Sequence, residues 1–379
     1  MAKKKKPVKG MTYAGTGVDY KAMDPFKRLA LEAALPTAKN LLTHGFREVR
    51  ESRGESAYVV DFGPFLLAFV EEGLGTKNKV AEEMRHLEKA MRGLTGRTFY
   101  DKSMQCNAAM AFNDLSSVGA APIISMLHVA AGSSKFFTNE KCNRDIVNGH
   151  ALACNLAGCS WGGGESPTLQ DIIYPGTGVF AGSAIGLINP KENLLLGSRI
   201  KVGDRIILLY GSGIHANGLT LARYLAELLE RGYLTELPSG ITYGEALLEP
   251  TVIYAPAMNA CVSMLHYGIN ITGHGWRKLM RALQSFRYVI ERIPEKGELF
   301  EFMQEHGKIS DREAYGNLNM NAGFAFIAPP ENVEKILLTI ERLGFDGLDA
   351  GHVESADRRS VVIEPLDNME FKEEELQVR

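Results

Sequence analysis

The sequence has few cysteines, little net charge and no long uninterrupted apolar run. Among its 379 residues, 42 basic and 45 acidic side chains leave a formal net charge of −3. This balance gives no overall positive field that would attract nucleic acid or anionic lipid. Apolar runs such as residues 58–73 are too short and too often interrupted by charge to cross a bilayer. We therefore expect a protein that binds neither nucleic acid nor membranes.

The five cysteines are odd in number and scattered along the chain. Only Cys154 and Cys159 lie close together in the sequence, and no matching pair of Cys or His residues stands near them. This spacing argues against both a zinc site and a disulfide framework. Buried thiols are the expected state.

Lysines are concentrated at residues 3–10 (KKKKPVKG). We expect a solvated terminus there, and an electrostatic tail is the alternative. Residues 11–20 are polar and glycine-rich, unlike the apolar core of a signal peptide. These features predict a cytoplasmic protein.

Strand-like and helix-like segments alternate along the chain, and its 45% apolar content is enough for the cores of two domains. Strands are predicted at 57–62, 65–70, 176–188, 205–210, 322–329, 351–355 and 358–365. Helices are predicted at 77–91, 142–160, 219–232, 254–268 and 331–346, and a helix followed by a strand within 107–132. A polar connector at 189–204 places the domain boundary near Pro190, giving domains 1–190 and 191–379. The pattern fits both α+β and α/β folds.

Three acidic positions fall in predicted glycine-rich or polar turns, and the first is EEGLGTKNK at 71–79. There Gly73 and Gly75 let backbone amides approach a phosphate, Lys77 adds positive charge, and the Glu72 carboxylate can hold Mg²⁺ between phosphate oxygens. The stretch is not a Walker loop, because GxxxxGK[ST] is absent. It predicts a phosphate-binding turn of another type.

The other two acidic positions are Asp114, which follows Asn113 inside an apolar helical stretch, and Glu165, which follows three glycines in WGGGESP. Each has an ordinary structural interpretation, because Asn-Asp can cap or turn a helix and a glycine-rich stretch can be a loop. The loop GSGIHANG at 211–218 lies between a predicted strand and a predicted helix. By itself its histidine, His215, is most simply a local hydrogen-bonding group.

Six motifs, taken in order, resemble the aminoimidazole ribonucleotide synthetase family, also called phosphoribosylformylglycinamidine cyclo-ligases. The motifs are EGLGTK (72–77), NDLSSVGAAP (113–122), GGES (163–166), SGIHANG (212–218), LEPTVIYAP (248–256) and LNMNAGF (318–324). The resemblance runs from about Tyr13 almost to the end of the chain. Their shared order and spacing carry a signal that none of them carries alone.

The resemblance implies an α+β, two-domain homodimer. Its N-terminal domain would form a dimeric β-barrel flanked by helices, and its C-terminal α/β domain would close a cleft for nucleotide and substrate. The implied reaction is ATP-dependent ring closure of formylglycinamidine ribonucleotide to aminoimidazole ribonucleotide, with release of ADP and phosphate. The implied ligands are ATP, Mg²⁺ and a small ribonucleotide.

The resemblance also implies roles for individual residues. Metal ligands would be Glu72, Asp114 and Glu165. ATP would be bound by Gly73, Gly75, Thr76, Lys77, Asn113, Asp114, Gly163, Gly164 and Glu165. Substrate would be bound by Ser212, Gly213, His215, Asn217, Thr272, Gly273 and Asn319. The catalytic residues would be Lys77, Asn217 and His215, with His215 donating a proton or binding an oxyanion near its ordinary pKa.

Several positions depart from the family pattern, including the segment PTLQD (167–171) that follows GGES. Ala14 replaces a lysine, Glu72 an aspartate, Asn270 a histidine, and both His274 and Asn321 replace glycines. These departures keep two alternatives open: a related ATP-dependent enzyme that phosphorylates a different small substrate, and a non-catalytic nucleotide-binding homologue. A pure scaffold would have no need for the acidic, basic and imidazole groups of the motifs, which favours an enzyme.

Overall fold

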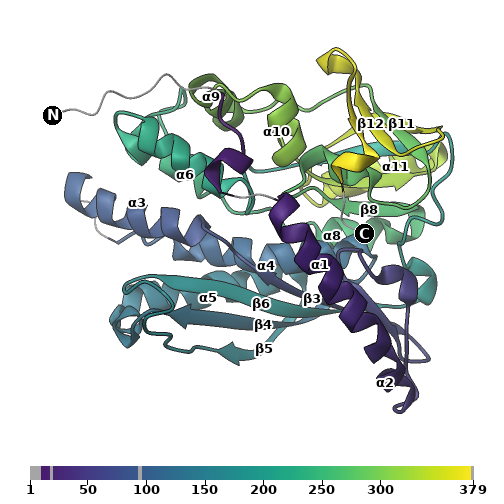
Figure 1. Ribbon diagram of the computed structural model, residues 1–379, viewed down its shortest axis with the longest axis horizontal. Coiled ribbons are helices and arrows are strands. Elements are labelled where there is room, and N and C mark those ends of the chain that lie inside the picture. The colour runs from purple at the N-terminus through teal and green to yellow at the C-terminus, as the bar shows by residue number, and fades with distance from the viewer. Residues whose placement is uncertain (1–9, 18–19, 93–95, 377–379) are drawn as a thin grey trace.

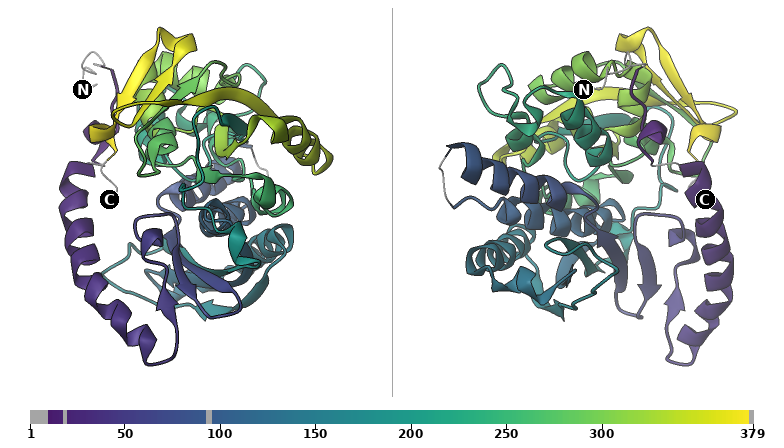
Figure 2. Two further views of the ribbon diagram at one scale, coloured as in Figure 1. Left: turned by 90° about the vertical axis from the view of Figure 1, so that its right-hand side faces the viewer. Right: turned by 60° about the vertical axis from the view of Figure 1, so that its left-hand side comes forward.

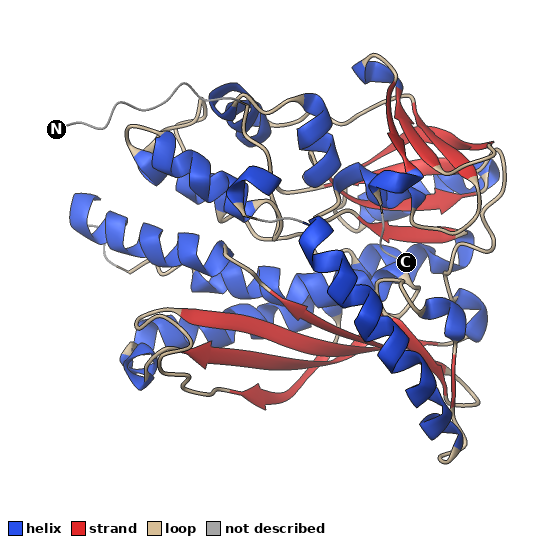
Figure 3. Ribbon diagram, viewed as in Figure 1, coloured by secondary structure: helices blue, strands red, loops and turns tan. Residues whose placement is uncertain are grey.

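The computed structural model describes residues 10–17, 20–92 and 96–376. Its strands form two separate sheets, one in each domain (Figure 3). Strand pairs are antiparallel except β4–β5 and β9–β12. Mostly antiparallel sheets place the protein in the α+β class. Most of the basic cluster at 3–10 lies outside the described residues.

The N-terminal sheet has six strands in the order β1-β2-β3-β6-β4-β5. Their bounds are β1 Arg47–Glu48, β2 Tyr58–Asp61, β3 Leu66–Gly73, β4 Ala121–Ala131, β5 Ser160–Glu165 and β6 Gly178–Ile188. The associated helices are α3 Lys77–Arg92, α4 Tyr100–Ser117 and α5 Glu140–Ala157. Helix α4 packs on strands β3, β4 and β6 and on helix α5.

Helix α4 lies between the two domains (Figure 1). Almost all of its residues are buried, and it contacts β8 and α8 of the C-terminal domain as well as the N-terminal sheet. Its sequence, rich in alanine and other small residues, allows close approach on several sides, and a helix without a polar face is typical of such a position. Polar side chains of α4 are therefore presented directly to the C-terminal domain.

The C-terminal sheet has seven strands in the order β13-β12-β9-β11-β7-β10-β8. Their bounds are β7 Arg205–Tyr210, β8 Tyr267–Asn270, β9 Phe286–Ile290, β10 Ala322–Ala328, β11 Gly347–Ser355, β12 Ser360–Ile363 and β13 Met369–Lys372. Its helices are α6 Leu219–Leu228, α7 Tyr243–Leu247, α8 Ala255–Cys261, α9 Glu298–Gly307, α10 Asp311–Asn317 and α11 Val333–Arg342. Every residue of β10 is buried, as expected of a central strand covered on both faces.

The start of the described chain lies against the C-terminal domain. The amide of Met11 donates to the carbonyl of Gly307 (3.1 Å), and the amide of Tyr13 donates to the Glu313 carboxylate (2.6 Å). Helices α1 (Tyr20–Ala34) and α2 (Lys39–Leu42) then run along the outside of the body (Figure 2). The boundary near Pro190 stays a prediction, and part of segment 1–190 packs on the second domain.

Most predicted elements are confirmed, but the three acidic turns are not turns. Glu72 lies in strand β3, Asp114 lies within helix α4, and Glu165 ends strand β5. At Gly164 an added Cβ would lie 1.8 Å from the carbonyl oxygen of Leu127, so glycine there permits close pairing of β5 with β4. A glycine run that suggested a turn is therefore a strand.

The predicted helix at 254–268 is also shorter than expected, because the α-helical part ends at Cys261 and strand β8 begins at Tyr267. All five cysteines are free thiols, of which Cys159 is half-buried and the others are buried. In the described residues, no helix is both long and apolar enough to span a bilayer.

Candidate active site

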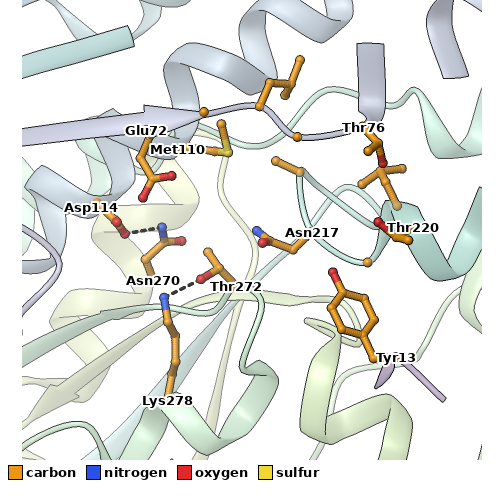
Figure 4. A pocket seen from close by; sticks show the side chains of 16 residues that line it. Tyr13, Glu72, Thr76, Met110, Asp114, Asn217, Thr220, Asn270, Thr272 and Lys278 are labelled. Carbon is orange, nitrogen blue, oxygen red and sulfur yellow. Dashed lines mark hydrogen bonds between the residues drawn. The ribbon is translucent and has the colours of Figure 1, made fainter. Parts of the chain in front are cut away.

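A polar cavity of about 230 Å³ lies where the two domains meet (Figure 4). Its walls come from the start of the chain, the β3–α3 turn, helix α4, the loop before α6 and the segment after β8. The lining residues are Tyr13, Glu72, Gly73, Leu74, Gly75, Thr76, Met110, Asp114, Ala216, Asn217, Gly218, Leu219, Thr220, Asn270, Thr272 and Lys278. Predicted nucleotide-side and substrate-side motifs thus share one cavity.

The β3–α3 turn presents backbone to this cavity. Strand β3 ends at Gly73, and Gly75 adopts a left-handed conformation (φ +68°) that glycine allows at no steric cost. Helix α3 begins at Lys77, so the turn lies at the positive end of a 16-residue helix. The buried hydroxyl of Thr76 has no hydrogen-bond partner. A turn with these features suits an anionic ligand that would accept from the free hydroxyl.

Two carboxyl groups from different elements meet on one wall of the cavity. Burial, together with the neighbouring Asp114 carboxylate, raises the pKa of Glu72 to about 8. The Asp114 Oδ1 atom accepts a hydrogen bond of 2.8 Å from the side-chain amide of Asn270 (Figure 4). Carboxylate oxygens in this setting match the ligands that Mg²⁺ takes alongside phosphates.

Lys278 is a cavity residue that sequence reasoning missed. Its ammonium donates to the hydroxyl of Thr272, and its side chain is buried. Burial lowers the pKa of Lys278 to about 8, against the opposing pull of Asp114 and Glu72. The available signal was a pair of basic residues, Arg277 and Lys278, among apolar residues in GWRKLM at 275–280.

His215 does not reach the cavity. It is buried in a left-handed conformation (φ +58°), and its Nε2 atom accepts from the backbone amide of Ser212 (3.2 Å), which leaves the ring proton on Nδ1. Burial, aided by the charge of Lys77, lowers the pKa of His215 to about 3. The expectation of a proton donor near its ordinary pKa is therefore wrong, and the imidazole is neutral at neutral pH.

Lys77 links the domains instead of facing the cavity. Its buried ammonium donates to the carbonyls of His215 (2.8 Å) and Glu249 (2.6 Å), both in the C-terminal domain. The prediction that it offsets phosphate charge directly has no support in this geometry. Lys77 holds the loop before α6 against helix α3.

Asn113 also connects the domains, as expected for a residue that holds a loop. Its side-chain amide donates to the carbonyl of Val252 (2.8 Å), and its Oδ1 atom accepts from the amide of Tyr254 (2.8 Å). Within the C-terminal domain, Asn319 donates to the carbonyl of Gly213 (2.9 Å). These contacts position the loops around the cavity.

Several predicted residues lie away from the cavity. Ser212, Gly213, Gly273 and Asn319 are not among its lining residues, whereas Asn217 and Thr272 are. Glu165, with Gly163 and Gly164, lines a separate apolar pocket beside Trp161. Across the part of the chain that the structure describes, no group of three or more His, Cys, Asp or Glu side chains is placed to hold a metal ion. Within one chain, Glu165 therefore does not join Glu72 and Asp114.

Comparison with known proteins assigns both domains. Residues 100–188 match the family described as AIR synthase related protein, N-terminal domain, and residues 201–364 match its C-terminal domain. A phosphoribosylformylglycinamidine cyclo-ligase of Thermococcus kodakarensis is 33% identical over 362 residues, covering 94% of this chain and 96% of the relative. One of Carboxydothermus hydrogenoformans is 31% identical over 373 residues, covering 93% and 99%. The chain belongs to the phosphoribosylformylglycinamidine cyclo-ligase family.

Solved structures share the fold of this cyclo-ligase family member at low sequence identity. A thiamine-monophosphate kinase from Stenotrophomonas maltophilia has a TM-score of 0.56 at 14% identity, covering 80% of this chain and 88% of that one. T. maritima PurL complexed with ATP has a TM-score of 0.53 at 14% identity, covering 86% and 48%. These likenesses show the two-domain fold.

Two of the positions expected to depart from the family pattern, Glu72 and Asn270, lie at the carboxyl pair. The side-chain amide of Asn270 donates to Asp114. His274 is outside the cavity lining, and burial together with the charge of Lys278 lowers its pKa to about 3. The wall from the C-terminal domain thus carries an amide and an ammonium toward the two carboxyl groups.

Proposed function

We propose that this chain is an ATP-dependent cyclo-ligase that converts formylglycinamidine ribonucleotide to aminoimidazole ribonucleotide, with release of ADP and phosphate in purine biosynthesis. The observation that carries the proposal is the interdomain cavity, which combines an anion-suited turn, a free Thr76 hydroxyl and the Glu72–Asp114 pair. The similarity to cyclo-ligases over more than nine-tenths of the chain selects this reaction. The enzyme would work in the cytoplasm.

The residues present fit a magnesium–nucleotide complex. Mg²⁺ is usually held by one or two carboxylates together with substrate phosphates, and Glu72 and Asp114 supply those carboxylates. The turn amides of Gly73 and Gly75 and the hydroxyl of Thr76 would receive phosphate oxygens. Bound Mg²⁺ would offset the charge that develops on the transferred phosphoryl group.

In the proposed reaction, ATP phosphorylates the formyl oxygen of the substrate, and a substrate nitrogen then attacks the activated carbon. Positioning and charge stabilisation are the main tasks of the protein, because no covalent enzyme intermediate is needed. Asn217, Thr272 and Tyr13, which line the cavity opposite the β3–α3 turn, would contact the ribonucleotide. His215 would act by positioning this loop, since it lies behind the wall.

The proposal includes a homodimer built on the open face of the N-terminal sheet. Ile124, Met126 and Val179 are exposed on β4 and β6. Large apolar side chains gathered on one face of a sheet favour burial against a partner. A second copy could cover this face, as the barrel expected for the family would require. Glu165, which ends β5, would then lie at or near the interface.

The proposed function is tested by incubating purified protein with Mg²⁺-ATP and formylglycinamidine ribonucleotide, and measuring phosphate and the aminoimidazole product. We expect both to form in equal amounts and only when substrate is present. Phosphate release with a different small substrate alone would instead favour the related ATP-dependent enzyme. Nucleotide binding without turnover on any substrate of the superfamily would favour the non-catalytic homologue.

A further inference from the structure

A buried ammonium already stands beside the proposed metal ligands. Lys278 is 7% exposed and Asp114 is 8% exposed, and both line the same cavity as Glu72. The Lys278 ammonium is oriented by the Thr272 hydroxyl, and Asp114 by the Asn270 amide. Both anchoring groups come from the segment that follows or ends β8. The C-terminal domain therefore holds an ammonium group in the same cavity as carboxyl groups of the N-terminal domain.

The charged groups that the structure describes around Lys278 do not supply another positive charge for the Glu72–Asp114 pair. The other charged groups that act on it are Glu55 and Arg281. Glu55 lies 3.6 Å from Arg281 and accepts a hydrogen bond of 2.9 Å from the hydroxyl of Tyr267, so these two charges largely offset one another. A buried carboxylate needs a compensating cation. Among the described residues that line the cavity, Lys278 is the cationic side chain beside Asp114 and Glu72.

This arrangement changes what a divalent cation meets in the nucleotide-free protein. A metal entering alone would add two positive charges beside a fixed ammonium in a poorly solvated site, where like charges repel strongly. A metal arriving with a triphosphate brings its own negative charge and oxygen ligands. The two routes of entry therefore differ in electrostatic free energy because of Lys278.

We propose that the ammonium of Lys278 is the resident counter-cation of the Glu72–Asp114 pair, so that a divalent cation binds this site only together with nucleotide phosphates. Lys278 is then a positioning residue that makes metal binding depend on nucleotide. The inference rests on the proposed use of Mg²⁺-ATP at this pair. The test measures metal binding and requires no turnover. The inference about Lys278 can therefore fail while the cyclo-ligase activity is found, and the activity can be absent while the inference holds.

The test is a titration of the nucleotide-free protein with Mn²⁺ alone, followed by the electron paramagnetic resonance signal of free Mn²⁺. We expect no binding to wild type below millimolar concentrations. Lys278→Met, which removes the charge at similar side-chain length, should bind one Mn²⁺ at least about 10-fold more tightly. Lys278→Arg, which keeps the charge, should behave as wild type.

Two matched controls locate the effect. Lys191→Met removes a lysine from an ion pair with Asp61 at the protein surface and should leave Mn²⁺ binding unchanged. Asp114→Asn in the Lys278→Met background should abolish the added affinity. Thermal unfolding of each variant reports whether it is folded.

Three results would overturn the inference. The first is tight binding of Mn²⁺ to nucleotide-free wild type, which is decisive even if Lys278→Met fails to fold. The second is unchanged Mn²⁺ affinity in folded Lys278→Met. The third is gained affinity that persists after Asp114→Asn, because the ion would then bind elsewhere.

Discussion

The buried imidazole of His215 makes the stability of the protein depend on pH. Its pKa is about 3 in the folded protein, below the ordinary value of 6.5, so the unfolded chain binds more protons between these values. The stabilisation is complete above pH 6.5 and is lost as the pH falls toward 3. At pH 5 the loss amounts to about 2 kcal/mol.

We therefore expect His215→Asn to flatten the fall in the free energy of unfolding between pH 7 and pH 5. Asparagine tolerates the left-handed conformation at this position. Urea unfolding at the two pH values measures the difference. An equally steep fall in the variant would mean that other groups cause the acid sensitivity.

Lys77 and Asp114 should separate stability from nucleotide binding. Lys77→Met leaves two buried carbonyls without their donor and should lower the free energy of unfolding by about 2–4 kcal/mol, whereas Lys79→Met on the exposed face of the same helix should have little effect.

Asp114→Asn should instead weaken Mg²⁺-ATP binding or turnover about 100-fold with a smaller loss of stability. Denaturant titration measures the stability of each variant, and calorimetry measures its nucleotide binding. Equal losses of stability in Lys77→Met and Lys79→Met would contradict the role given to Lys77.

At the scale of elements, glycine in strand β5 is required by backbone approach. Gly164→Ala would force a Cβ to within 1.8 Å of the carbonyl of Leu127, so we expect partial loss of the β4–β5 pairing and a melting temperature lower by several degrees. Gly162→Ala is the matched control, because its nearest contact is the flexible side chain of Met126 at 3.1 Å. Similar melting temperatures for the two variants would show that the strand tolerates the change.

Local elements could be predicted because their signals are local. Helix α3 has its apolar and charged residues at helical spacing, and strand β7 is an apolar run that ends at a glycine loop. The strand character of β5 could not be predicted from its three glycines, since the reason for them is a neighbouring strand more than thirty residues earlier.

The cavity was only partly predictable. The motifs predicted that Glu72 and Asp114 act at one site, and both line the cavity. No periodicity indicates that Lys278, more than 160 residues after Asp114, lines the same cavity. The burial that makes His215 neutral is likewise a tertiary property. The assignment of Lys77 to a phosphate failed because carbonyls of the other domain compete for its ammonium.

At the scale of the whole molecule, the open sheet face predicts self-association. Ile124→Glu and Met126→Glu place charge on that face and should convert a dimer to a monomer in sedimentation velocity. Leu338→Glu, at an exposed apolar position on helix α11, is the control and should leave the dimer intact. A monomeric wild-type protein at micromolar concentration would contradict the proposed homodimer.

At this scale, the two domains together are proposed to activate a formyl oxygen for ring closure. The most direct measurement uses formylglycinamidine ribonucleotide labelled with ¹⁸O at the formyl oxygen, turned over with Mg²⁺-ATP, followed by mass spectrometry of the released phosphate. The account predicts that phosphate carries one ¹⁸O atom for each aminoimidazole ribonucleotide formed. Unlabelled phosphate, or phosphate formed without the aminoimidazole product, would contradict it.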